Sequence, residues 1–224
     1  MKQYASVFNV VWKDMLSHFR SAETIISVPF FSIITIFVFA FAFNAGQTGV
    51  AAEQSAGIIW IAFTFACVIG LGQAFVNEKQ NSCLKGLLLC PVERPIIYLG
   101  KLAVSFIMIS MMEAVTTPVF LTLFKVSCNI PDLAAVIILT TIGLSAVGTL
   151  FSVISSASRV REILFPIIFF PVILPLLITA ITATGSIFKG KLLGDVMPWI
   201  GVIIAFDVLF ITIALLIFEV TVEE

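Results

Sequence analysis

Charged residues are scarce in this 224-residue sequence. Only 11% of the residues are Asp, Glu, Lys or Arg and 60% are hydrophobic, whereas about 25% of a typical soluble domain is charged. So few charges cannot cover a surface exposed to water, which excludes a soluble enzyme or binding domain. The net charge of −1 gives no indication of a nucleic-acid partner, and we expect none.

Residues that bind metals or activate substrates are also few. The sequence has one histidine, His18, and lacks the Cys-x-x-Cys-His motif that attaches haem. The four cysteines have no metal-site spacing; they are Cys67, Cys83, Cys90 and Cys128. We therefore expect this chain to bind no metal and no cofactor itself, and an intramembrane enzyme is the weakest functional hypothesis.

A nucleotide-binding motif is missing as well. Residues 185–192 (GSIFKGKL) approach the pattern of a phosphate-binding loop, but Leu192 replaces the Ser or Thr that would bind Mg²⁺. No predicted strand precedes the segment, as the motif requires. We therefore expect ATP hydrolysis, where it is needed, to take place on a partner subunit.

The sequence does contain six apolar stretches of about the 20 residues that cross a bilayer. Helices satisfy their backbone hydrogen bonds internally, and the stretches lack the alternation of barrel strands. We predict an all-α integral membrane fold, in which residues 25–218 form one transmembrane domain of six helices. The predicted spans are 25–43, 57–76, 102–124, 133–154, 163–183 and 199–218.

Residues 1–24 have the pattern of an amphipathic helix. Apolar side chains recur at helical spacing, among them Tyr4, Phe8, Met15 and Phe19, and polar residues occupy the other faces. Such a helix is expected to lie in the cytoplasmic membrane interface. Packing against the protein's own spans is the alternative.

Basic residues are divided unevenly between the two sides of the membrane. With the N-terminus inside, nine Lys and Arg residues fall in cytoplasmic segments and three, Lys125, Lys189 and Lys191, in outer segments. Basic residues accumulate on the cytoplasmic side. We therefore predict a multi-pass membrane protein with both termini, including the tail 219–224, in the cytoplasm.

The predicted cytoplasmic connection, residues 77–101, is the most informative segment. An amphipathic stretch in it is followed by two prolines, which predicts a short surface helix and then a rigid turn. In a merely solvated loop, Leu84, Leu87 and Leu88 would be exposed to water without need. We therefore favour docking of this segment into a cytosolic partner, with Arg94 at the rim of the contact.

Residues 84–94 (LKGLLLCPVER) and 97–101 (IYLGK) resemble the CcmB family of haem exporter permease subunits. These are membrane components of an ABC transporter of cytochrome c maturation. The resemblance extends to residues 57–78, to Glu113 and Pro118 in the third span, and to the proline-rich fifth span. A looser form of the pattern is shared by other ABC-2-type permeases.

This resemblance implies a coupling segment that receives the motion of a separate, CcmA-like ATPase subunit, which binds the ATP. It also implies CcmC-like and CcmD-like membrane partners in the bacterial inner membrane, with haem handled by the complex. Two copies of the chain would together supply the twelve helices of an ABC-2-type pore, so a homodimer is expected. The residues that the resemblance assigns to coupling are Glu78, Leu84, Leu87, Leu88, Pro91 and Arg94.

Two acids lie near the middle of predicted spans, Glu113 in the third and Asp207 in the sixth. A charge at this depth costs about 3 kcal/mol or more unless it is paired, protonated or hydrated. The acids face either a translocation path or a partner subunit, or they are protonated and hydrogen-bonded within the bundle. They leave open an ion-coupled secondary transporter as an alternative function, besides the permease of another ABC-2-type exporter.

Three prolines lie in the fifth span, at Pro166, Pro171 and Pro175. Each removes a backbone donor and crowds the preceding turn, which predicts that this helix kinks or breaks. Residues 184–198, which follow, are expected to form a re-entrant loop or to lie along the outer surface.

Overall fold

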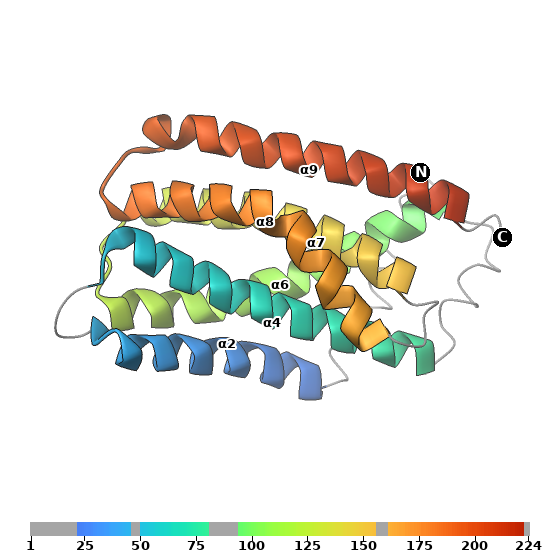
Figure 1. Ribbon diagram of the computed structural model, residues 1–224, viewed down its shortest axis with the longest axis horizontal. Helices are drawn as coiled ribbons and strands as arrows, with labels where there is room; N and C mark the ends of the chain where they lie inside the picture. Colours follow the sequence, from blue (N-terminus) through green and yellow to red (C-terminus); the bar gives the residue numbers. More distant parts are fainter. Residues whose placement is uncertain (1–21, 46–49, 81–93, 156–160, 222–224) are drawn as a thin grey trace.

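The computed structural model describes residues 22–45, 50–80, 94–155 and 161–221. Within these ranges the chain is helical and contains no strand, which confirms the predicted all-α fold. Six helices follow one another (Figure 1): α2 (Ala22–Ala42), α4 (Ala52–Gln80), α6 (Arg94–Phe124), α7 (Ile130–Ser155), α8 (Arg161–Phe188) and α9 (Leu193–Thr221).

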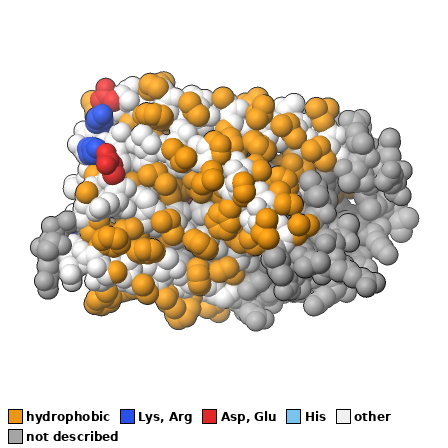
Figure 2. Space-filling view, viewed as in Figure 1, with side chains coloured by type: hydrophobic (Ala, Val, Ile, Leu, Met, Phe, Trp, Pro, Cys, Tyr) orange, Lys and Arg blue, Asp and Glu red, His pale blue; other side chains and the backbone are white. Residues whose placement is uncertain are grey.

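The hydropathy of these helices is that of a membrane protein. In α2 the described apolar stretch, Ile26–Ala42, is shorter than a full span. Figure 2 shows hydrophobic side chains over the flank of the bundle, where lipid tails would lie. These features confirm a multi-pass membrane architecture. Within the described ranges, five stretches are long and apolar enough to cross a bilayer: Ala52–Gly72, Ile97–Phe124, Ile130–Ser152, Leu164–Phe188 and Gly194–Ile217.

The helices run roughly along the long axis of the molecule (Figure 1). At one end, three connections join α2 to α4, α6 to α7 and α8 to α9; we call this the short-loop end. Because consecutive helices alternate in direction, the opposite end holds Gln80, the last residue of α4, and Arg94, the first residue of α6.

The core forms where α4, α7 and α8 pack together. Trp60 of α4 is fully buried, and its indole Nε1 donates a hydrogen bond of 2.9 Å to Thr184 Oγ1 of α8. Buried indole N–H groups generally require such a partner. Helix α2 packs on α4 where Gly70 leaves room, since a Cβ atom built there would lie 3.3 Å from Val28 Cγ2.

Helix α8 contains its three prolines without interruption and runs continuously from Arg161 to Phe188. Figure 1 shows that it bends in its middle, because each proline removes a backbone N–H donor and its ring crowds the preceding turn. The helix packs against α4, α7 and α9, which support it along its bent course. The prediction of a kink is confirmed, and the alternative of a broken helix is wrong.

Residues 184–198 do not form the re-entrant or surface loop that was expected, so that prediction is wrong. Helix α8 continues to Phe188 and α9 begins at Leu193, which leaves only a tight turn between them. Val196, one of the apolar residues in this segment, is buried in the first turns of α9. Its hydrophobicity reflects helix packing rather than contact with the membrane surface.

Gly190 explains how the turn can be so tight. Its φ of +80° lies in the left-handed region, which glycine adopts without steric cost. Its N–H donates to the Ile187 carbonyl at 2.9 Å, and the N–H of Lys191 donates to the Ser186 carbonyl at 3.2 Å. This is the Schellman pattern of a helix end, so the glycines that approach a phosphate-binding motif belong in part to the cap of α8.

Candidate functional site

Two buried carboxylates lie on opposite sides of α7. Glu113 of α6 is 2% exposed and Asp207 of α9 is 5% exposed. Glu113 Oε2 accepts a hydrogen bond of 2.6 Å from Thr141 Oγ1 of α7, and Asp207 Oδ1 lies against Gly143 of the same helix. Positions 141 and 143 are about 200° apart around an α-helix. The two acids therefore occupy separate places in the interior of the bundle.

Only one of the two oxygens of the Glu113 carboxylate has a hydrogen-bond partner among the described residues. Its Oε2 atom accepts the bond from Thr141, whereas Oε1 is buried and has no hydrogen-bond partner. One turn earlier, Ser110 Oγ is likewise buried without a partner. An unsatisfied buried polar group costs about 1–3 kcal/mol. These two atoms are therefore candidate contact points for another molecule.

Glu113 and Ser110 both line a groove between α6 and α7. The groove has a volume of about 470 Å³. On the side of α7 it is bordered by the exposed residues Ile130 and Ile138. The sequence marks Glu113 as a charge within a span, but the groove results from how two helices pack and leaves no signal in the sequence.

Asp207 has different surroundings, at the junction of α7, α8 and α9. Its Oδ1 atom is also buried and has no partner among the described residues. The side chains that share the space beside Gly143 are apolar, Leu176 of α8 and Phe206 of α9. Asp207 is thus enclosed by three helices, whereas Glu113 borders a groove. Glu113 is the stronger candidate for contact with another molecule.

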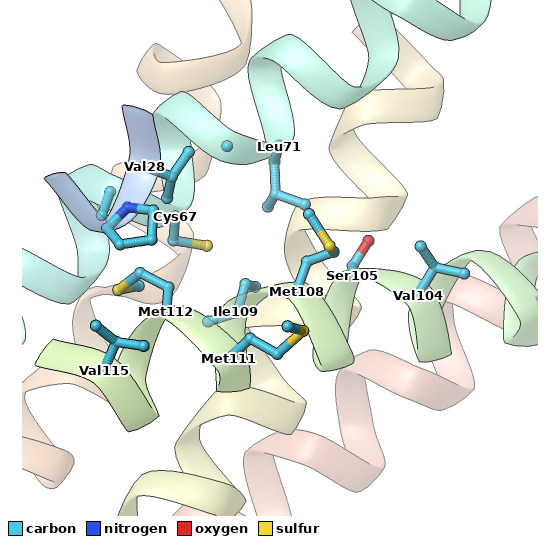
Figure 3. A pocket seen from close by; sticks show the side chains of 13 residues that line it. Val28, Cys67, Leu71, Val104, Ser105, Met108, Ile109, Met111, Met112 and Val115 are labelled. Atoms are coloured by element: carbon cyan, nitrogen blue, oxygen red, sulfur yellow. The ribbon is translucent and has the colours of Figure 1, made fainter. Parts of the chain in front are cut away.

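A second cavity, of about 150 Å³, lies between α2, α4 and α6 (Figure 3). Its polar residue is Ser105, whose Oγ atom accepts a hydrogen bond of 3.1 Å from Thr149 Oγ1. The remaining lining is apolar and rich in sulfur, and it suits a hydrocarbon group rather than a charged one. The methionines recur at i, i+3 and i+4, a spacing that marks one helix face. The sulfur-bearing residues are Cys67, Met108, Met111 and Met112.

The residues predicted to couple to an ATPase lie only partly within the described ranges. Glu78 is in the last turn of α4 and Arg94 is the first residue of α6, so both lie at the end opposite the short-loop end. The helices therefore extend into the predicted connection, 77–101, from both sides. The predicted interfacial helix, except for residues 22–24 in α2, lies outside the described residues, as do Leu84, Leu87, Leu88 and Pro91.

The third span begins earlier than the predicted residue 102. Its apolar stretch is Ile97–Phe124, and Lys101, counted in the predicted connection, is 4% exposed within this helix. Tyr98 explains the earlier start, because its hydroxyl donates a hydrogen bond of 3.0 Å to the Ala146 carbonyl of α7. The beginning of α6 is thereby fixed against α7.

Charged side chains gather at the short-loop end (Figure 2). Lys189, which the charge count places on the outer side, forms an ion pair with Glu53 at the start of α4. Both side chains are well exposed, so the pair contributes little stability. It does offset the charge of a lysine at the end that the distribution of basic residues assigns to the outside.

Comparison with protein-family models gives a match. The family model described as CcmB protein matches residues 5–223, which is nearly the whole chain. The match includes all six helices, both acids and the predicted coupling segment. No curated protein matches the sequence.

Proposed function

The chain belongs to the CcmB family, and we propose that it is the membrane permease subunit of an ABC transporter complex that exports or delivers haem for the biogenesis of c-type cytochromes. The family match over residues 5–223 carries this proposal. The helical membrane bundle supports it, because a permease needs spans and no catalytic domain. The family consists of permease subunits rather than enzymes, so we assign ATP hydrolysis to a separate subunit.

The ATPase is proposed to dock on the connection between α4 and α6. Glu78 and Arg94 lie where these two long helices end, on the same side of the bundle. A continuous helix such as α4 would carry a displacement at Glu78 toward Trp60, which is hydrogen-bonded to α8 near the short-loop end. Leu84, Leu87, Leu88 and Pro91 are proposed to supply the apolar and rigid part of the contact.

Co-purification of the ATPase with full-length variants tests this docking. Leu87→Glu places a charge in the apolar contact, and Arg94→Glu reverses a charge at its rim, so each is expected to lower the ATPase recovered at least about tenfold. Leu192→Glu is the matched control, since Leu192 is an exposed leucine at the short-loop end. Full recovery with both Leu87→Glu and Arg94→Glu would reject the docking site.

Further features of the complex are proposed with it. We propose CcmC-like and CcmD-like membrane partners, a CcmA-like ATPase that binds the ATP, and a second copy of this chain. Among the described residues, no group of three His, Cys, Asp or Glu side chains is placed to hold a metal ion. We propose that the contacts with haem are made within the complex. The bacterial inner membrane, with both termini in the cytoplasm, is the proposed location.

A second candidate function, ion-coupled secondary transport, is favoured by one observation. Glu113 and Asp207 each keep a buried carboxylate oxygen without a partner, and such intramembrane acids form proton relays in transporters. Transport of haem into liposomes that contain this chain without an ATPase, driven by a pH gradient and lost in Glu113→Gln, would select this function. Transport that occurs only with the ATPase and ATP would select the permease.

A further inference from the structure

The groove between α6 and α7 offers hydrogen-bond acceptors that have no donor among the described residues. Glu113 Oε1 and Ser110 Oγ are both buried without a partner in that part of the chain, and both residues line the groove. Pro118, which also lines it, has no N–H to donate to the Ala114 carbonyl one turn earlier. These groups recur on one face of α6, so they point to an occupant that donates hydrogen bonds.

The depth of Glu113 restricts what this occupant can be. Eleven residues separate Glu113 from Phe124, the end of α6 at the short-loop end, which corresponds to about 16 Å of helix. This is about half of the 30 Å thickness of the hydrocarbon core. Lipid headgroups do not lie at this depth, and lipid tails have no donor groups. A protein side chain can supply the donor there.

The type of donor follows from the hydroxyl side chains of this protein. Most threonines in its spans donate to the carbonyl of residue i−4 in their own helix. A partner hydroxyl, which has one hydrogen, would share it between such a carbonyl and the carboxylate, as Thr141 does. A Lys or Arg side chain has several N–H donors and carries the charge that complements a carboxylate. The threonines that bond to their own helix are Thr35, Thr116, Thr117, Thr122, Thr140, Thr141, Thr179, Thr182 and Thr212.

We propose that the groove between α6 and α7 receives a transmembrane helix of another membrane subunit, which places a Lys or Arg side chain against Glu113 and Ser110. The small side chains of Ala114 and Ala134 line the groove and allow a helix to approach closely. The exposed Ile130 and Ile138 border it and would pack on the flanks of that helix. This inference rests on the proposed function in one respect: the partner is a membrane subunit of the same complex.

Site-specific photocrosslinking of the complete complex in native membranes tests this contact. A photoreactive amino acid replaces Ile138, which is 49% exposed in the groove, or Val208, which is 61% exposed on α9 away from it. The Ile138 probe is expected to crosslink to one membrane subunit, at a peptide with a Lys or Arg at mid-depth of a span. The Val208 probe is not expected to give this product.

Variants of Glu113 then test the role of the carboxylate. Glu113→Leu is expected to lower the Ile138 crosslink at least about tenfold, and replacing the mapped Lys or Arg by Leu should do the same. Thr141→Val removes the hydroxyl that contacts Oε2 and the Ile137 carbonyl but leaves Oε1 unaltered, so it should leave the crosslink in place. Glu113→Gln keeps the shape of the side chain and its hydrogen-bonding oxygen, so it should lower the crosslink less than Glu113→Leu. It keeps the test valid if the leucine variant accumulates poorly.

Three results would overturn the proposal: products at Ile138 that contain only lipid, products that contain only a second copy of this chain, or a crosslink unchanged in Glu113→Leu. Failure of the ATPase docking is distinguishable from failure of this contact. Leu87→Glu is expected to release the ATPase while the Ile138 crosslink persists, because the groove lies in the half of α6 nearer the short-loop end.

Discussion

The Asp207 carboxylate lies so close to Gly143 that a Cβ atom built on this glycine would come within 2.4 Å of Asp207 Oδ1. The same atom would lie 2.7 Å from Leu176 Cδ2 of α8. Glycine at position 143 is therefore the residue that lets α8 and α9 pack their side chains directly against the backbone of α7. A buried acid fits into this junction because α7 has no side chain there.

Gly143→Ala is expected to destabilise the protein by about 1–3 kcal/mol, the usual cost of overpacking a close contact. Gly57→Ala is the matched control, because it makes the same change within a helix at a site with no atom within 4 Å of the new Cβ. That change should be neutral or stabilise by up to about 1 kcal/mol. The midpoint of thermal unfolding in detergent checks both variants, and an unchanged midpoint in Gly143→Ala would contradict the packing described for Asp207.

The fold and the two acids could be predicted from the sequence for the same reason. Long apolar runs are unstable when exposed to water, so they indicate membrane spans. A carboxylate within such a run, as at Glu113 and Asp207, costs free energy, and for that reason it is easily recognised in the sequence. The sequence does not show which helix each side chain faces. Nothing in the chain indicates that both acids point at α7, or that Thr141, 28 positions from Glu113, donates to its carboxylate.

The prediction for residues 184–198 was wrong because these residues serve contacts and a helix cap that hydropathy does not show. The run 184–198 mixes glycine, lysine and apolar residues, which is typical of a surface loop. In the structure Thr184 is buried against Trp60, Gly190 caps α8, and Val196 is buried in α9. Each of these residues either contacts a distant part of the chain or forms a helix cap. Hydropathy alone predicts neither the contacts nor the cap.

Thr184→Val should destabilise the protein by about 1–3 kcal/mol. Valine has a similar shape to threonine but cannot accept the 2.9 Å hydrogen bond from Trp60 Nε1, which leaves a buried donor without a partner. Thr184→Ser retains the hydroxyl and should recover most of this loss, apart from the missing methyl group. Denaturation in detergent measures both variants. Equal stability of the valine variant and the unaltered protein would show that the bond contributes nothing.

Lys125 ends α6 in a conformation that suits glycine better. Its φ is 52°, and the N–H of Val126 donates to the Leu121 carbonyl at 3.2 Å, which is the arrangement in which Gly is usual. A side chain in the left-handed region costs about 1 kcal/mol. Lys125→Gly is therefore expected to raise the free energy of unfolding by up to about this amount, whereas Lys191→Gly, at an exposed position outside that region, should not.

Labelling of Cys128 tests both the burial of this thiol and the proposed orientation. Partial burial raises the pKa of the Cys128 thiol, and only the thiolate reacts with maleimides. Near neutral pH its thiolate fraction is therefore below that of an exposed cysteine, and its labelling should accelerate as the pH rises. Lys191→Cys, exposed at the same end, should label faster near neutral pH.

The experiment uses spheroplasts and a membrane-impermeant maleimide, with Cys83 and Cys90 replaced by serine; Cys67 is fully buried. If the short-loop end faces outward, both Cys128 and Lys191→Cys are labelled in intact spheroplasts, the former more slowly. Labelling of both only after lysis would place this end in the cytoplasm and reverse the proposed orientation. Equal rates at both positions near pH 7 would instead contradict the raised pKa of Cys128, whichever way the protein is oriented.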